Sequence, residues 1–314
     1  MIAYRACEGF DELEACVQLQ IETWGMEAGE VVARKTFFLA QKIGGQVIGA
    51  FDTEIPGISP QGGPESLVGF VMALPGVKTG APGDRFSSLG WDTGASGDRF
   101  SSLGWDTGAS GDRFSSLGWD TCSREPQPYL HSHMLAVRES YRNRGLGAQL
   151  KQEQRREALA RGIRLIEWTF DPLEIKNAHL NIHKLGAIVR RYEVNFYGVS
   201  SSRLQGGLPT DRLVAEWQLD SPRVQAILEG RPAAEYAVDE RIQVPASIYQ
   251  WKASEAGREQ ALNIQSENRR KFQDAFSQRL AVTGYSLDAE GNGIFALGRL
   301  AGAETHSCGE TEVR

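Results

Sequence analysis

The segment Leu135–Ala148 contains the residues best suited to bind a ligand. It reads L-A-V-R-E-S-Y-R-N-R-G-L-G-A, so a strand-like L-A-V is followed by a turn and then by the start of a helix. The first turn of a helix has unpaired N–H groups and a positive dipole end, which favour an anion. Gly145 and Gly147 let a phosphate approach the backbone closely, and Arg142 and Arg144 add positive charge. The pattern predicts a phosphate site; the alternative is a glycine-containing turn with solvated arginines.

This segment resembles the acetyl-CoA motif of the GNAT superfamily of N-acyltransferases, [Gln/Arg]-x-x-Gly-x-[Gly/Ala]. Arg142, Gly145 and Gly147 occupy its fixed positions. The resemblance extends over about residues 2–219 once an inserted repeat is set aside, and it is strongest to a branch of uncharacterised predicted acetyltransferases. It implies a mixed α/β sheet that opens between the strand before the motif and the strand after it, with acyl-CoA bound in the opening.

The resemblance also implies roles for single residues. Backbone amides from Arg142 to Ala148 would hold the pyrophosphate, and the thioester would lie near Leu135–Val137. Asn177 lies in a helix where the family often has an Asn that contacts the cofactor, although its spacing to Gly186 differs from the usual one. The implied cofactor-binding residues are therefore Leu135, Ala136, Val137, Arg142, Asn143, Arg144, Gly145, Leu146, Gly147, Ala148 and Asn177.

Acyl transfer to an amine needs a base that makes the amine neutral and a proton source for the departing CoA thiolate. Many family members have a Glu base on the strand before the motif; the matching position here is His131, and histidine titrates near neutral pH. The position of the family's usual Tyr acid is Ile182, so Tyr192 and Tyr197 are the nearest alternatives, with water as a third. We expect His131 as base and Tyr192 as acid; the alternative for His131 is an ordinary polar residue near a loop.

Three carboxylates, Glu167, Asp171 and Glu174, lie at and beyond the end of the next predicted strand. Carboxylates there are suited to holding a cationic amine. The alternative interpretation is that they are solvated or cap the next helix, since Asp171-Pro172 is typical of a helix start.

Two other functions compete with acyl transfer. His131-x-His133 on a strand and His179-x3-His183 on a helix each place two imidazoles on one face, and four such ligands suit zinc. The missing Tyr also leaves room for a non-catalytic acyl-CoA-binding module. We expect an acetyl-CoA-dependent N-acetyltransferase without a metal. It would transfer the acyl group directly to a primary amine, because no Cys or Ser lies in a nucleophile motif. A small metabolite, an amino-acid derivative and a protein amine all stay open as acceptors.

Alternating strands and helices around the motif predict an α/β fold. We expect strands at 2–6, 46–54, 66–74, 129–137, 163–170, 187–194, 212–219, 241–244, 281–287 and 294–300. We expect helices at 11–24, 31–43, 145–161, 173–185 and 254–279. Asp11 is the expected N-cap of the first helix, with Glu14 completing a capping box. Residues 221–237 read as a connector. In and just after the last helix, the residues expected in the core are Leu262, Phe272, Phe276 and Leu280.

Residues 79–120 consist of three nearly identical 14-residue copies, T-G-A-[P/S]-G-D-R-F-S-S-L-G-W-D. Each copy is rich in Gly and Ser and buries little apolar surface to offset the entropy of ordering. We interpret the block as a flexible surface insertion; the alternative is an arm whose aromatic residues bind a partner. The predicted organisation is a GNAT-like domain over 1–219, a small α+β subdomain over 220–300 and a flexible tail over 301–314. The subdomain caps the cleft, forms a dimer contact or is a degenerate second copy of part of the fold.

The composition indicates a soluble protein with a real core: 314 residues, of which 41% are hydrophobic and 24% charged. The net charge of −6, half of it in the repeat, argues against a duplex nucleic-acid partner. Four cysteines without paired spacing indicate neither a disulfide framework nor a zinc ribbon. No apolar stretch is long enough for a membrane span, and the first residues lack the pattern of a signal peptide. We therefore expect a cytoplasmic protein without a membrane partner, and a homodimer stays open.

Overall fold

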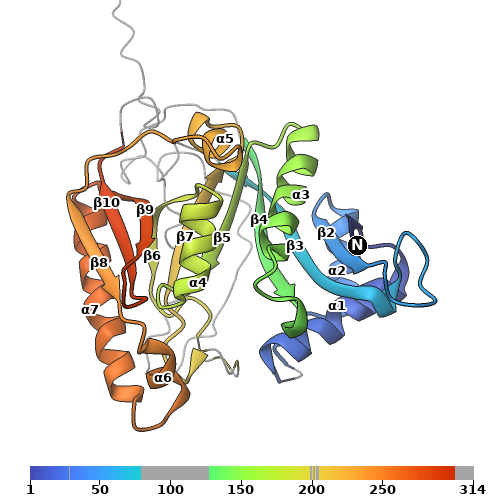
Figure 1. The fold of residues 1–314 in the computed structure, drawn as a ribbon, viewed down its shortest axis with the longest axis horizontal. Coiled ribbons are helices and arrows are strands. Elements are labelled where there is room, and N and C mark those ends of the chain that lie inside the picture. Colours follow the sequence, from blue (N-terminus) through green and yellow to red (C-terminus); the bar gives the residue numbers. More distant parts are fainter. Residues whose placement is uncertain (28, 79–126, 199, 201, 203–204, 301–314) are drawn as a thin grey trace, which may run out of the picture.

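The computed structural model describes residues 1–27, 29–78, 127–198, 200, 202 and 205–300 (Figure 1). The tandem repeat at 79–120 and the tail at 301–314 lie outside the described residues, so the interpretations given to them above stay predictions.

A mixed ten-stranded sheet runs through the described residues in the order β1-β2-β3-β4-β5-β7-β6-β9-β10-β8. Every neighbouring pair is antiparallel except β4 and β5, which are parallel. The predicted fold class, a mixed α/β sheet, is thereby confirmed. The strands are β1 (Ile2–Ala6), β2 (Gln46–Asp52), β3 (Leu67–Lys78), β4 (Gln127–Val137), β5 (Leu165–Phe170), β6 (Ile188–Glu193), β7 (Arg212–Gln218), β8 (Glu240–Val244), β9 (Ala281–Leu287) and β10 (Gly293–Gly298).

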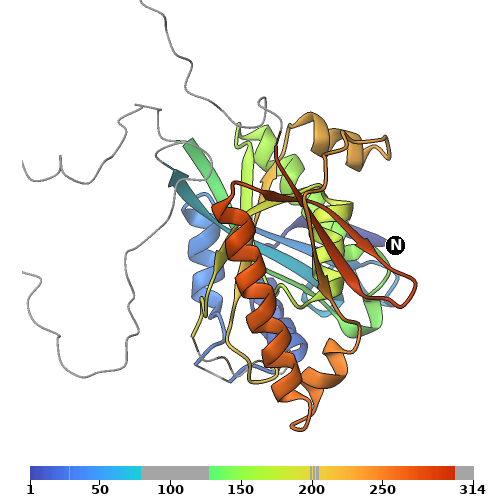
Figure 2. The same cartoon turned by 90° about the vertical axis from the view of Figure 1, so that its left-hand side faces the viewer.

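Helices cover both faces of the sheet: α3, α4 and α5 lie on one face, and α1, α2 and α7 lie on the other (Figures 1 and 2). On α3, Leu146 and Leu150 recur at helical spacing and pack against Val68 and Val71 of β3, which fixes this helix across the first half of the sheet. The helices are α1 (Gly9–Trp24), α2 (Arg34–Lys42), α3 (Leu146–Ala160), α4 (Ile175–Ala178), α5 (Pro222–Leu228), α6 (Ile248–Ala253) and α7 (Arg258–Ser277), with short η1 (Pro64–Ser66) and η2 (Glu139–Tyr141) and the π-helical η3 (His179–Lys184).

The predicted start of the first helix is wrong. α1 begins at Gly9, so Asp11 lies inside the first turn and Glu8 is the N-cap, without a side-chain capping bond. Glu12 takes over the capping role because its carboxylate accepts the backbone N–H of Glu8 at 2.7 Å. Arg5 holds that carboxylate in place with two further hydrogen bonds, at 2.6 and 2.8 Å. The second helix likewise begins three residues later than expected, at Arg34.

The C-terminal part differs from the prediction in three places. The expected connector contains α5, whose N-cap Ser221 accepts the N–H of Val224 at 3.3 Å. The expected long helix begins four residues later than predicted, at Arg258, and an unexpected helix, α6, precedes it; the chain turns between them at Gly257, where a Cβ would lie 2.5 Å from the backbone of Trp251. Of the four residues expected in the core, Phe272 and Leu280 are buried, Phe276 is partly buried against the core, and Leu262 is 40% exposed.

The C-terminal strands extend the same sheet. β6 and β9 pair at Val189 and Val282. The buried guanidinium of Arg223 donates to the carbonyls of Gly186 at 3.0 Å and Thr283 at 2.6 Å, which ties the two parts together. The division at residue 219 therefore stays a prediction about domains, within one continuous sheet.

Candidate active site

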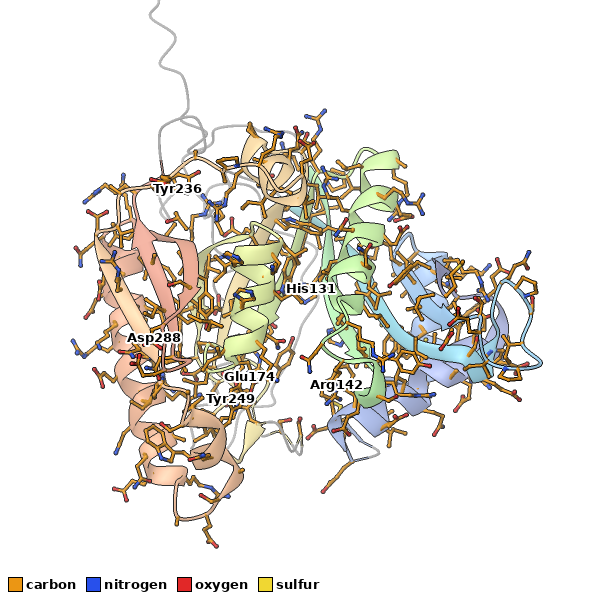
Figure 3. All side chains as sticks on the ribbon, in the orientation of Figure 1. His131, Arg142, Glu174, Tyr236, Tyr249 and Asp288 are labelled. Atoms are coloured by element: carbon orange, nitrogen blue, oxygen red, sulfur yellow. The ribbon has the colours of Figure 1, made fainter. Side chains whose placement is uncertain are left out.

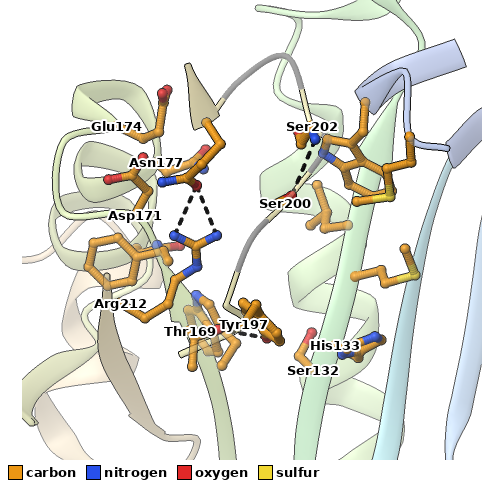
Figure 4. Close-up of a pocket in the computed structure, with 18 of the residues that line it drawn as sticks. Ser132, His133, Thr169, Asp171, Glu174, Asn177, Tyr197, Ser200, Ser202 and Arg212 are labelled. Atoms are coloured by element: carbon orange, nitrogen blue, oxygen red, sulfur yellow. Dashed lines mark hydrogen bonds between the residues drawn. The ribbon is translucent and has the colours of Figure 1, made fainter. Parts of the chain in front are cut away.

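The parallel pair β4–β5 opens after only two registered pairs, Leu130 with Ile166 and His131 with Glu167. Beyond this point the two strands no longer pair, and a cavity of about 460 Å³ lies between them (Figure 4). The opening predicted for the sheet is thus present where it was expected. The two strands contribute Ser132, His133, Met134 and Leu135 from β4, and Trp168, Thr169 and Phe170 from β5, with Asp171 directly after β5.

The N-terminus of α3 lies beside the cavity, although none of the predicted loop residues 142–148 lines it. Gly145 is the N-cap with φ 83°, a left-handed conformation that other residues adopt at a cost, and a Cβ there would meet nothing within 4 Å. It provides no side-chain cap, so the first N–H groups of α3 keep their capacity to bind an anion. Arg142 is exposed, and its Nε donates to the carbonyl of Val137 at 3.1 Å. Figure 3 shows Arg142 at the foot of α3.

Gly147 connects the helix start with the cavity. A Cβ built on it would lie 3.6 Å from Leu135 Cδ2 and 3.7 Å from Leu180 Cδ2, and both leucines line the cavity. Asn177, another predicted cofactor-binding residue, lines it too. Ala136 is buried and packs into the core on the face of α1 and α2, so its backbone rather than its side chain is available. Leu135 and Asn177 therefore line the cavity itself, whereas Gly147 lies behind its wall, against Leu135 and Leu180.

The predicted base lies at the floor of the opening. His131 belongs to the last registered pair and is not part of the cavity lining, whereas His133, whose ring centroid lies 6.3 Å from that of His131, lines the cavity. Burial, with the nearby His133, Lys151 and Arg191, lowers the pKa of His131 to about 4. Burial also lowers the pKa of His133. Both imidazoles are neutral at pH 7 and able to accept a proton.

The predicted acid, Tyr192, lies away from the cavity. Its hydroxyl donates to Asp211 at 2.6 Å, and its ring stacks on Phe272. Burial and the bond to Asp211 raise the pKa of Tyr192. Tyr197, the other tyrosine considered from the sequence, lines the cavity with its hydroxyl 3.0 Å from Thr169 Oγ1. The geometry thus brings Tyr197, and not Tyr192, into the site.

The three carboxylates expected near an amine are already paired. Glu167 binds Lys78 and, at 3.1 Å, Arg191. Asp171 and Glu174 both bind Lys252, which comes from α6, at 2.9 and 2.8 Å. Of the two roles considered for them, a structural role describes all three better than recognition of a cationic substrate.

A residue that sequence reasoning missed is Lys151 of α3. It is 3% exposed and lines the cavity, and its ammonium nitrogen donates to Ser132 Oγ at 2.7 Å. Burial lowers its pKa well below the ordinary value. No pattern in the sequence distinguished it, because Lys151 is one of many charged residues on α3.

Two loops meet at the mouth of the cavity. The end of α1 contributes Trp24, and the segment after it contributes Met26, Glu30 and Val32. The segment between β6 and β7 contributes Tyr197, Ser200, Ser202 and Gln205. Ser200 Oγ donates to Glu30 Oε2 at 3.2 Å, which joins the two loops. Figure 4 shows Ser200 and Ser202 facing the β4 wall across the cavity from Asp171, Glu174 and Asn177.

The rival metal site is not formed in the part of the chain that the structure describes. Within these residues no three His, Cys, Asp or Glu side chains are grouped to hold a metal ion. His179 and His183 stack on each other with ring centroids 4.6 Å apart, and His179 also packs against Tyr285. None of the described helices has both the length and the apolar character needed to cross a membrane.

Comparison with known families agrees with this geometry. The model described as "Acetyltransferase (GNAT) family" matches residues 111–186, which include β4, the glycine loop, α3, β5, α4 and η3. The chain carries a GNAT acetyltransferase domain. A GNAT domain transfers an acyl group from acyl-CoA, with acetyl-CoA as the donor, to an amine. No curated protein matches the chain.

Several solved structures share parts of the fold at low identity. Arabidopsis thaliana NAA60 in complex with acetyl-CoA is 17% identical, covers 70% of this chain and 100% of its own, and has a TM-score of 0.46. The ribosomal-protein-S18-alanine N-acetyltransferase from Escherichia coli is 12% identical, covers 70% of this chain and 96% of its own, and has a TM-score of 0.42. An N-acetyltransferase from Staphylococcus aureus Mu50 is 13% identical, with 70% and 99% coverage and a TM-score of 0.40.

Proposed function

We propose that acyl-CoA binds with its pyrophosphate at the N-terminus of α3 and its thioester between β4 and β5, and that a primary amine enters from the opposite mouth. The observation that carries this proposal is the opening of the parallel pair immediately beside a glycine-capped helix start. Gly147 supports the path of the pantetheine arm, since the space beside it leads between Leu135 and Leu180 into the cavity. The exposed Arg142 supplies positive charge where the pyrophosphate would lie.

The acceptor would enter between the two loops at the mouth. Trp24, Met26 and Val32 make one side apolar, while Tyr197 and Ser200 provide hydroxyl groups on the other. An amine attached to a partly apolar group fits such a lining. Because Asp171 and Glu174 are both already paired with Lys252, neither is left free to hold a cationic amine, which favours an amine that arrives neutral or loses its proton on entry.

Proton transfer would use groups of the lining. We assign the base to His133, which is neutral and lies in the cavity wall, and keep His131 as the second candidate because it lies next along the same face. Tyr197 is the corresponding proton donor for the CoA thiolate. Tyr192 would act only as a structural residue that supports β6 and β7 through Asp211.

A thiol-release assay over a panel of acyl-CoAs and primary amines tests this function, with calorimetric titration of CoA run in parallel. The double variant Arg142→Ala, Gly147→Val should abolish CoA binding while its circular dichroism and melting temperature stay near those of the wild type. Unchanged CoA affinity in that variant would refute the site. Tight CoA binding without turnover for any amine would favour the non-catalytic binding module instead. A cytoplasmic location, with a GNAT-like domain over 1–219 and a small subdomain over 220–300, completes the proposal.

A further inference from the structure

Lys151 occupies the deep end of the opening. Its Nζ donates to Ser132 of β4 and lies 3.8 Å from the ring centroid of Trp168 of β5, so it bridges the two strands just beyond their last registered pair, His131 with Glu167. In the part of the chain that the structure describes, no carboxylate forms an ion pair with it. His131 lies near enough for Lys151 to contribute to the lowering of its pKa.

Such surroundings favour the neutral amine form of a lysine over the ammonium ion. Burial without a counter-charge disfavours the protonated form, which is how proteins turn a lysine into a nucleophile. A neutral amine has two N–H groups and one lone pair. Ser132 accepts one N–H, and the face of Trp168 receives the other, so the lone pair is the part of the nitrogen left for reaction. Ser132 does not compete for that lone pair, because its own hydroxyl donates to Gln154 Oε1 at 3.1 Å.

The position of Lys151 lies in line with the expected path of the donor. Along β4, Leu135 is close to the glycine loop, His133 and Ser132 lie deeper, and His131 closes the floor. A thioester that passes Gly147 and Leu135 therefore approaches the amine at the deep end. The flexible four-carbon stem of lysine lets Nζ move within the cavity to meet it.

We propose that Lys151 is itself an acyl acceptor, so that bound acyl-CoA acylates its side chain when no external amine is present. The inference rests on the proposed donor site. The Nζ lone pair forms a bond to the thioester carbonyl carbon and the carbon–sulfur bond breaks. The amine proton passes to the CoA sulfur, which leaves an amide on Lys151 and free CoA thiol. No oxidant, reductant or further reactant is needed.

The product differs from an ordinary acyl-enzyme intermediate. An amide is too stable to pass its acyl group to a second amine, and the added acyl group takes up space in the cavity. Self-acylation therefore removes a protein molecule from turnover, and an external amine that reacts first protects it. At a low concentration of the external amine, more protein molecules would be acylated on Lys151 and the acyltransferase activity would fall.

Peptide mapping by mass spectrometry after incubation of the full chain with acetyl-CoA tests the proposal. We expect one acetyl group on Lys151, introduced at least about tenfold faster than on the exposed Lys35, because the bound donor holds its thioester beside Lys151 in the cavity. Labelling should saturate with acetyl-CoA and be blocked by CoA. S-acetyl-N-acetylcysteamine, which lacks the pyrophosphate, should label both lysines without preference. Lys151→Met and Lys151→Arg should lose the fast label, and Lys35→Met should keep it.

Two results would overturn the proposal in distinguishable ways. If titration shows that CoA binds but Lys151 is acetylated no faster than Lys35, self-acylation is refuted while the donor site stands. If CoA does not bind at all, the proposed function fails and self-acylation fails with it. Should both Lys151 variants be unfolded, the wild-type map with and without CoA still decides between these outcomes.

Discussion

His131 of β4 lies opposite Glu167 of β5 in the last registered pair of the only parallel ladder among the described strands. Glu167 is held by Lys78 and Arg191, so the floor of the opening is fixed by charges on both sides of β5. From the next residue onward, β4 and β5 present their backbones to a cavity instead of to each other. The last registered pair therefore closes the deep end of the cavity and limits how far the thioester of a bound donor reaches between the strands.

Gly147→Val should weaken binding of acetyl-CoA by about tenfold or more, equivalent to about 1.4 kcal/mol. The valine methyl groups would occupy the space between Leu135 and Leu180, whose Cδ2 atoms lie 3.6 and 3.7 Å from a Cβ at this position. Helix α3 tolerates a side chain there, so the melting temperature should change little. Calorimetric titration with CoA measures the effect, and an affinity equal to that of the wild type would show that the donor does not pass Gly147.

Gly145→Ala and Gly162→Ala form a matched pair. Both glycines have positive φ, 83° and 75°, and a Cβ at either would meet no atom within 4 Å, so each variant should lose about 1 kcal/mol of unfolding free energy. Only Gly145 caps the helix start that faces the proposed pyrophosphate. Chemical denaturation should therefore give similar losses for the two variants, whereas CoA titration should show weaker binding for Gly145→Ala alone. Equal affinities would contradict the assignment of the anion site to this turn.

The sequence was informative about the proposed donor site because that site uses backbone N–H groups. A strand followed by Arg142, Gly145 and Gly147 defines a helix start with free N–H groups, and that geometry is local in the chain. The same holds for most strands, where apolar alternation and glycine turns act over a few residues. The errors at Asp11 and Ser221 concern single capping bonds, which depend on side chains such as Glu12 that propensity alone does not select.

The catalytic side was predicted less well, because it is assembled from distant segments. Lys252 pairs with Asp171, which lies 81 residues away in the sequence. Asp211 accepts the hydroxyl of Tyr192, which lies 19 residues away, and so holds that hydroxyl outside the cavity. Neither contact leaves a pattern in the sequence. Lys151 was missed for a different reason: a lysine among many charges on α3 reads as solvated, and only the opening of β4 from β5 makes its position a buried one.

Tyr197→Phe and Tyr192→Phe should have opposite effects. Tyr197 lines the cavity, so loss of its hydroxyl should lower kcat by about tenfold or more, with little change in stability. Tyr192 donates to the fully buried Asp211, so loss of its hydroxyl should cost about 1–3 kcal/mol of unfolding free energy and leave kcat nearly unchanged. Steady-state kinetics with thermal unfolding separates the two. A large loss of kcat in Tyr192→Phe, with a native melting temperature, would return the acid role to Tyr192.

The acid limb of the pH–rate profile should identify the base. A base acts when deprotonated, and burial lowers the pKa of His133 below 6.5, so kcat/KM should be constant at neutral pH and fall only below that value. A limb at about pH 4 would instead assign the base to His131. His133→Gln should remove the limb if His133 is the base, and His131→Gln should leave it in place. Persistence of the limb in His133→Gln would reject His133.

Lys252→Met should destabilise the fold and disturb the cavity wall. It leaves Asp171 and Glu174 without their cation, and removing one partner from a buried ion-pair cluster costs about 3–5 kcal/mol. Burial alone would lower the pKa of Lys252, but the two carboxylates raise it above 10.5. The wild type should therefore keep this stabilisation at neutral pH and lose it only as the pH rises through that raised pKa.

The variant should behave in the opposite way, gaining stability as the pH falls and its two unpaired carboxylates take up protons. Chemical denaturation at about pH 5, 7 and 9 measures the free energy of unfolding of both proteins on either side of neutrality. The triple variant Lys252→Met, Asp171→Asn, Glu174→Gln serves as the control, because a cluster without charge avoids the unpaired carboxylates. If Lys252→Met is as stable as the triple variant at every pH, the ion pairs with Asp171 and Glu174 do not support this wall of the cavity.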